Sequence, residues 1–101
     1  MTYAEVKTML ASSGLPVAYR AFESITNPPF IIWMSDADNN FAADGKVFFS
    51  AHQIRIELYT TKVDVESETA LENALSEHFY TKERIYIDEE KMYETIYELE
   101  V

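Results

Sequence analysis

The final stretch of the chain, residues 85–101, alternates between apolar and charged side chains, and this pattern constrains the fold most strongly. The apolar or aromatic series is Ile85, Ile87, Tyr93, Thr95, Tyr97, Leu99 and Val101, and the series between them includes Tyr86, Asp88, Glu94, Glu98 and Glu100. A period of two is typical of half-buried strands, because successive side chains point to opposite faces of a sheet. A short turn at Glu89, Glu90 and Lys91 separates the two runs. We therefore predict a terminal β-hairpin with one apolar face and one face of carboxylates.

The beginning of the chain predicts a helix. Thr2 and Glu5 have the spacing of a capping box, and the apolar residues that follow share one helical face, so we expect a helix from Thr2 to about Ser13. Gly14 can adopt the left-handed conformation that ends many helices, and Pro16 prevents further helical turns.

Two strands are expected next. Val17–Phe22 has the character of a short strand, and Phe30–Met34 is a continuous apolar run that we interpret as a central strand. Between them, the Asn27-Pro28-Pro29 sequence predicts a rigid turn. Both prolines, Pro28 and Pro29, are compatible with a cis or a trans peptide bond, and the sequence leaves this open.

Residues 46–60 have the pattern of an unusually long strand. One predicted face carries Phe48, Ser50, His52, Ile54, Ile56 and Leu58, and the other carries Gln53, Arg55, Glu57 and Tyr59. Because strands average about five or six residues, such a strand must extend past the core or bend at a bulge, and we predict a projecting hairpin arm. The preceding segment, Asp36–Gly45, is rich in turn-forming residues, so we interpret it as an irregular loop, the longest of the chain.

A second helix completes the predicted order of elements. Asp64 has the position of an N-cap, and an apolar stripe predicts a helix over Val65–Phe79; the stripe consists of Ala70, Leu71, Ala74, Leu75 and His78. The order is α-β-β-β-α-β-β, with no linker. We therefore predict one α+β domain over residues 1–101, in which two helices pack on one face of a mainly antiparallel sheet.

The charge of the chain restricts its partners. Its 101 residues include 8 lysines and arginines and 18 aspartates and glutamates, which gives a formal net charge of −10. We expect neither sequence-specific nucleic-acid binding nor membrane binding, because this charge repels phosphate groups. The sequence has no cysteine, which excludes disulfides and thiolate metal sites, and it has the features of neither a signal peptide nor a membrane span. We expect a soluble intracellular protein.

The acidic segment in the middle of the chain partly matches a calcium-binding loop. Asp36, Asp38 and Asn40 have the spacing of its first ligands, but the positions of the required Gly and Glu hold other residues. A looser cation site that includes Asp44 is left as the alternative to a solvated acidic loop.

The other polar residues indicate no reaction. His52 and His78 lie on different predicted elements, whereas a metal centre needs three or four convergent ligands. The serines lack the context of an activated nucleophile. Carboxylates of the terminal hairpin are expected to point to solvent, where they stay ionised, so they form either a solvated face that prevents aggregation or a surface for a partner. We predict no catalytic residue, no cofactor and no bound metal, and hence no enzyme.

Several stretches carry a family resemblance that covers nearly the whole chain. They are Met1–Leu10 with Ser13–Tyr19, Asn40–Val47, Ile56–Thr60 and Glu90–Val101. In these stretches the chain resembles small proteins encoded in the head-to-tail joining region of siphophages and prophages of Gram-positive bacteria. Proteins related to that group by fold, the tail-terminator and tail-completion proteins, pack helices against an antiparallel sheet and assemble as rings, commonly hexamers.

The resemblance implies a virion protein that is made in the bacterial cytoplasm. Its implied partners are further copies of itself in a ring, the head connector and the tail-tube protein. A ring of subunits that each carry a charge of −10 would have an anionic wall, along which DNA passes without adhering because its phosphates are repelled.

We predict that the acidic loop contacts these partners. The interaction residues are Asp36, Asp38, Asn39, Asn40, Phe41 and Asp44. Phe41 is the apolar member of the set, and its ring either packs back on its own domain or anchors a partner.

Two other classes of function stay open. An acidic inhibitor that mimics DNA would occupy the basic groove of a host DNA-binding protein, and the net charge supports this alternative. Mimicry requires acidic groups spaced like phosphates over a continuous surface, however, and basic residues such as Lys46, Arg55, Lys82 and Arg84 interrupt the series. A small enzyme is the third class, and it lacks convergent chemical groups.

Overall fold

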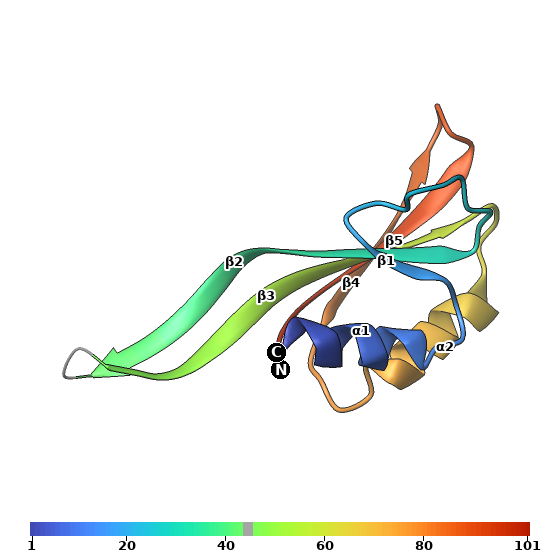
Figure 1. The fold of residues 1–101 in the computed structure, drawn as a ribbon. Coiled ribbons are helices and arrows are strands. Elements are labelled where there is room, and N and C mark those ends of the chain that lie inside the picture. Colours follow the sequence, from blue (N-terminus) through green and yellow to red (C-terminus); the bar gives the residue numbers. More distant parts are fainter. Residues whose placement is uncertain (44–45) are drawn as a thin grey trace.

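The structure, a computed structural model, describes residues 1–43 and 46–101, with side chains described for 1–35 and 51–101. In this part of the chain the elements are α1 (Tyr3–Ala11), β1 (Val17–Tyr19), β2 (Phe30–Ala43), β3 (Lys46–Thr60), α2 (Val65–Ala74), β4 (Thr81–Ile87) and β5 (Met92–Glu100). The predicted α+β class and the predicted order of elements are confirmed (Figure 1).

The five strands form one sheet in the order β1-β2-β3-β5-β4. β1 runs parallel to β2, and the other neighbouring pairs are antiparallel. The centre of the sheet is β3, whereas the apolar run that we predicted as the central strand begins β2, one position away. The bond between Pro28 and Pro29, on the approach to β2, is cis.

Both helices lie on the same side of the sheet (Figure 1). Their buried residues join those of β2, β3 and β5 in one core, which contains Val6, Leu10, Ile31, Trp33, Ile54, Ile56, Leu58, Leu71, Leu75, Tyr97 and Leu99. We call this side the helix face and the opposite side the open face, because no helix of the described chain covers it. The helix face holds the apolar half of the predicted β3 pattern.

Both predicted helix starts are confirmed. The Thr2 hydroxyl accepts a hydrogen bond from the Glu5 backbone N–H at 3.1 Å, and the Thr2 N–H donates to the Glu5 carboxylate at 2.9 Å, which completes the capping box. The Asp64 carboxylate accepts from the Ser67 N–H at 3.0 Å. Gly14 follows α1 with a φ of 82°, in the left-handed region.

Three elements end earlier than predicted: α1 stops at Ala11 instead of about Ser13, and α2 and β1 are shortened by more. α2 ends at Ala74 instead of Phe79, because the apolar stripe that packs on the sheet stops at Leu75 and the Phe79 side chain is fully exposed. β1 ends at Tyr19 because Arg20 takes a φ of 66°, which turns the chain out of the strand.

The β2–β3 hairpin forms the predicted arm. The two strands pair from Phe30 with Tyr59 as far as Ala43 with Lys46. β1 pairs with β2 only as far as Trp33, and the pairing of β3 with the C-terminal segment ends at His52, which exchanges two backbone hydrogen bonds with Val101. Beyond these points a two-stranded ribbon projects from the body (Figure 1), and the long axis of the molecule reaches 51 Å.

The predicted loop at Asp36–Gly45 is wrong for residues 36–43, which continue β2 to Ala43. Register shifts follow Ser35, where Asp36 of β2 is the extra residue, and Phe41, where the extra residue is Phe48 of β3, so the pairing continues through irregularities in both strands. The physical reason is the partner: the long β3 offers a continuous row of backbone groups, and pairing with it outweighs the weak strand propensity of Asp and Asn.

The terminal hairpin forms as predicted, but its faces differ from the prediction. Ile87 pairs with Met92, so odd-numbered residues of β4 share a face with even-numbered residues of β5. Ile85 therefore lies on the open face opposite Glu94 and is 38% exposed. The helix face of β4 instead presents Lys82, Arg84 and Tyr86.

Candidate interaction surfaces

The predicted interaction residues lie on the arm. Asp36, Asp38, Asn39, Asn40 and Phe41 belong to β2, whereas Asp44 lies outside the described residues, and all six side chains lie outside the described ones. The backbone pairs Asp38 with His52, Asn40 with Ser50 and Phe41 with Phe49. The predicted cation site at Asp36, Asp38 and Asp44 also falls on side chains outside the described set.

The arm offers two backbone edges along its projecting part. In the ladders of the described chain, residues 37–43 pair only with β3, and residues 46–51 pair only with β2. Every second N–H and C=O group along such a strand points away from its neighbour. Exposed strand edges are templates for pairing with another chain, so the arm can bind through its backbone as well as its side chains.

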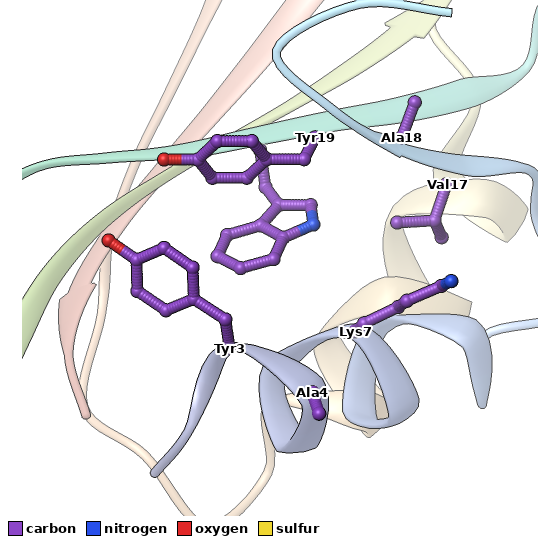
Figure 2. A pocket seen from close by; sticks show the side chains of 7 residues that line it. Tyr3, Ala4, Lys7, Val17, Ala18 and Tyr19 are labelled. Carbon is purple, nitrogen blue, oxygen red and sulfur yellow. The ribbon is translucent and has the colours of Figure 1, made fainter.

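A groove lies at the base of the arm, between α1 and β1 (Figure 2). It encloses about 320 Å³, and its lining comes from Tyr3, Ala4, Lys7, Val17, Ala18, Tyr19 and Trp33. The Trp33 ring is 3% exposed and packs edge-on against the rings of Tyr3 and Tyr19, with centroids 5.4 and 4.7 Å away. Tyr3 and Tyr19 are 40% and 39% exposed, so the groove presents aromatic edges to solvent.

The groove has a cationic rim. Lys7 lines it from α1, and within the described residues Lys7 forms no ion pair. The Arg20 guanidinium lies 5.5 Å from the centroid of the Tyr19 ring. Carboxylates are absent from the described lining. This positive, aromatic groove contrasts with a chain whose net charge is −10.

The open face carries aliphatic and acidic residues side by side. By register its central part consists of Phe30, Ile32, Met34, Arg55, Glu57, Tyr59, Ile85, Ile87, Glu94 and Ile96. Glu57 and Glu94 are only 9% and 7% exposed, which corrects the prediction that the hairpin carboxylate Glu94 points to solvent. Its neighbours on β3 and β4 exclude water from it.

One phenol connects these two carboxylates. The Tyr59 hydroxyl lies 3.0 Å from Glu57 Oε1 and 2.7 Å from Glu94 Oε2, and Arg55 Nε donates to Glu57 Oε2 at 2.8 Å. A single hydroxyl proton can satisfy only one carboxylate at a time. Burial raises the pKa of Glu94, and the charge of Glu57 raises it further. The pKa of Tyr59 is also raised, first by burial and then by its bond to Glu94. The cluster therefore makes Glu94 easier to protonate than an isolated glutamate.

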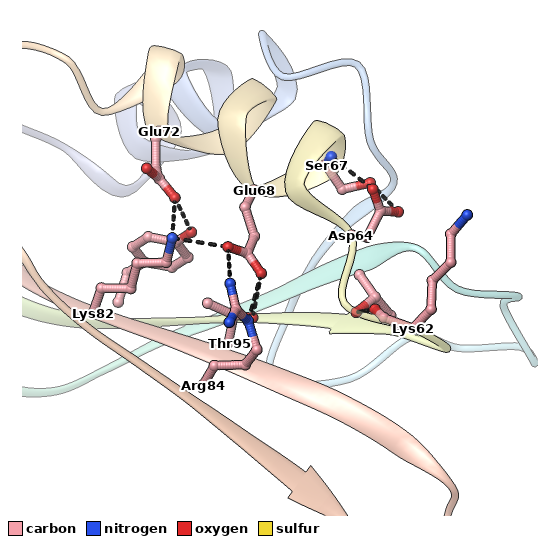
Figure 3. Close-up of polar contacts among 10 residues, drawn as sticks. Lys62, Asp64, Ser67, Glu68, Glu72, Lys82, Arg84 and Thr95 are labelled. Atoms are coloured by element: carbon pink, nitrogen blue, oxygen red, sulfur yellow. Dashed lines mark hydrogen bonds and ion pairs between the residues drawn. The ribbon is translucent and has the colours of Figure 1, made fainter.

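A second acidic network lies on the helix face and has cationic partners (Figure 3). Arg84 binds Glu68 through two bonds, Nε to Oε2 at 2.8 Å and Nη2 to Oε1 at 2.6 Å. Lys82 Nζ lies 2.8 Å from Glu68 Oε1 and 2.7 Å from Glu72 Oε2, and the Tyr97 hydroxyl donates to Glu72 at 2.7 Å. The bond to Arg84 is the main cause of a lowered pKa of Glu68. Desolvation opposes the shift at Glu72, but bonds from Lys82 and Tyr97 lower its pKa overall. This network fastens α2 to the terminal hairpin.

The histidines are not brought together as ligands. His52 packs its ring 5.0 Å from that of Tyr3, while His78 follows α2, where its backbone N–H donates to the Leu75 carbonyl at 2.9 Å. Among the described residues, no three His, Asp or Glu side chains are grouped as a metal site would require. Neither described helix has the length and apolar character needed to cross a bilayer.

In comparisons with known proteins, no family model matches the chain and no curated protein matches it significantly.

Proposed function

We propose that this chain is a structural protein of the phage head-tail junction, which self-associates into a ring and joins the tail to the capsid connector. The sequence resemblance suggests the role. The feature that carries it is the arm, because a two-stranded ribbon that leaves the core contributes little to its own domain and is suited to contact a neighbour.

The distribution of charge supports the same role. Several carboxylates of the domain are neutralised internally by Arg55, Lys82 and Arg84. The remaining excess stays negative at the surface and repels DNA phosphates, which suits a collar through which DNA passes. In this proposal the arm is the part of the domain that contacts the partners, and the acidic residues Asp36 and Asp38, predicted to bind them, lie on its first strand, β2.

Shortening the arm tests the proposal. Residues 40–50 are removed, and Asn39 is joined to Ala51, its cross-strand partner, through an Asn-Gly turn. The variant is supplied to a phage genome that lacks the wild-type chain, and the particles are viewed by electron microscopy. We expect a folded domain, shown by circular dichroism, together with separate heads and tails.

The matched control is Phe79→Ser, which alters a fully exposed side chain outside the arm and should give joined particles. Joined particles with the shortened arm would contradict the proposal. The acidic inhibitor of a DNA-binding protein stays the alternative hypothesis, and it predicts normal particles with either variant.

A further inference from the structure

The groove between α1 and β1 has a composition that its own fold does not require. Its cationic rim, formed by Lys7, lies beside two half-exposed tyrosine rings on a strongly acidic chain, and the Arg20 guanidinium lies 5.5 Å from the centroid of one of these rings. A polypeptide segment that fits this groove must combine negative charge with an exposed apolar or aromatic side chain.

We infer that the groove binds the turn between β4 and β5 of a second copy of this chain. The inference rests on the self-association in the proposed function, and it names the two surfaces that meet. The arm is a separate surface in this arrangement.

Charge complementarity supports this occupant. The β4–β5 turn contains three consecutive acidic residues, Asp88, Glu89 and Glu90, which are all exposed, followed by the single cation Lys91. The turn is therefore negative, whereas the groove is positive. Among copies of an acidic protein, a contact that pairs these two surfaces reduces the repulsion between subunits.

The apolar part of the hairpin also matches. Tyr86 is 48% exposed and Ile85 is 38% exposed, and both lie within three residues of the acidic turn. A volume of about 320 Å³ is at the lower end of the usual range for binding pockets, which suits one or two side chains better than a whole ligand. Tyr86 or Ile85 can enter the groove while the carboxylates reach its cationic rim.

The two surfaces lie far apart on one molecule. Figure 1 shows the turn between β4 and β5 well away from α1, so a chain cannot fill its own groove. Contacts between two different surfaces are heterologous, and they produce rings when the rotation closes. One small contact is weak, because stable interfaces bury at least about 1,200 Å². Ring closure and the arms would add the remaining contacts.

Charge exchange tests the inference in the full-length chain. Lys7→Glu reverses the groove, and the double change Glu89→Lys with Glu90→Lys reverses the turn; both alter exposed residues, so the fold should persist. Self-association is measured by sedimentation velocity over a series of protein concentrations at low salt. Emission of Trp33, the only tryptophan, reports on the groove itself. Lys62→Glu is the matched control, because it removes an exposed lysine outside the groove.

Each reversed variant alone should self-associate about tenfold or more weakly than the wild type, since like charges then meet. Mixing the two variants in equal amounts should restore association, because the reversed groove of one variant then meets the reversed turn of the other. The change in Trp33 emission that accompanies association of the wild type should return as well. Unchanged association in either single variant, failure of the mixture to recover, or a wild type that stays monomeric at all concentrations would overturn the inference. The proposed joining function is judged independently by the particles formed with the shortened arm.

Discussion

Two buried glutamates on opposite faces of the sheet have opposite electrostatic environments. Glu68, on the helix face, is 3% exposed and binds Arg84 and Lys82. Glu94, on the open face, is 7% exposed and shares the Tyr59 hydroxyl with a second carboxylate, Glu57. The pKa is lowered at Glu68 and raised at Glu94. Burial alone therefore does not decide the charge of a carboxyl group; its partners do.

This difference distinguishes the two faces energetically. On the helix face of the described chain the polar and apolar groups all have partners. Glu68 and Glu72 form ion pairs with Lys82 and Arg84, and the two helices cover the apolar residues of the sheet. On the open face Glu94 is buried beside a second carboxylate, Glu57, with which it shares one hydroxyl donor. Half-buried aliphatic residues such as Ile32 and Met34 lie on this face, which no helix of the described chain covers. Stability is concentrated on one face, and the other is left available for contacts.

The largest expected effect compares apolar truncations on the two faces. Ile56→Ala on the helix face should reduce the free energy of unfolding by about 3 kcal/mol, because Ile56 is fully buried and a cavity results. Met34→Ala on the open face should cost less than about 1 kcal/mol, because this side chain is only half-buried. Urea unfolding measures both. Equal losses would show that the open face is as well packed as the helix face.

The next effect concerns the helix-face network. Glu68→Gln should reduce the free energy of unfolding at neutral pH by about 2 kcal/mol, because Arg84 and Lys82 lose their shared anion. The loss stays below that of a fully buried pair, since these cations keep 35% and 33% of their side chains exposed. Thermal unfolding checks it, with the exposed Glu66→Gln on the same helix as control. If Glu68→Gln reduces the free energy of unfolding no more than Glu66→Gln does, the ion pairs of the helix face do not stabilise the fold, and the proposed difference between the two faces is wrong.

The same substitution on the open face should have the opposite sign. Glu94→Gln should increase the free energy of unfolding at neutral pH by about 1 kcal/mol, because the amide can donate to Glu57 while its oxygen still accepts from Tyr59. Chemical denaturation at neutral pH measures it. Destabilisation by Glu94→Gln would mean that the carboxylate is the favoured form and that our interpretation of the cluster is wrong.

The smallest expected effect is the pH dependence of the free energy of unfolding that Glu94→Gln adds. A carboxyl whose folded pKa is raised stabilises the fold fully below its unfolded pKa, and this contribution is lost as pH rises through the folded value. The stabilisation of the fold by Glu94→Gln should therefore disappear below about pH 4. The titratable groups facing Glu94 are the neutral phenol Tyr59 and the charged Glu57 and Arg55 on β3, with Glu98 on its own strand and Glu83 on β4. A stabilisation independent of pH would exclude a titrating Glu94.

Glu68 and Glu72 depend on pH in the opposite direction. Their contribution to the free energy of unfolding is present at neutral pH and is lost as pH falls through their lowered folded pKa values.

Local patterns in the sequence were sufficient for most elements. The capping box at Thr2, the N-cap at Asp64 and the long alternation in β3 act within a few residues, so the sequence predicts them directly. Residues 36–43, the half of the arm that was not predicted as a strand, are extended because they pair with β3, which lies outside any local pattern. Asp44-Gly45, between Ala43 and Lys46, is a dipeptide typical of two-residue hairpin turns, and it was the signal that residues 36–43 form a second strand.

The candidate surfaces were harder to predict, because they combine residues that are distant in sequence. The groove joins Tyr3, Tyr19 and Trp33 from three elements. Glu94 is buried because of the register that places it beside Tyr59, and one residue of difference in the β4–β5 pairing moves Ile85 to the other face. The charges on β4 were a usable signal: Lys82 and Arg84 alternate with the residues around them, as expected if one face of this strand meets the acids of α2.

The arm and the body share their two longest strands, and this has a mechanical consequence. β3 runs without interruption from the projecting ribbon into the centre of the sheet, where β5 holds it from Gln53 to Thr60. A pull on the end of the arm therefore acts along the strands, and ladder bonds perpendicular to that direction are strained together rather than opened one by one. A neighbour that grips the ribbon would transmit load directly to the most strongly held strand, as a joint under tension requires.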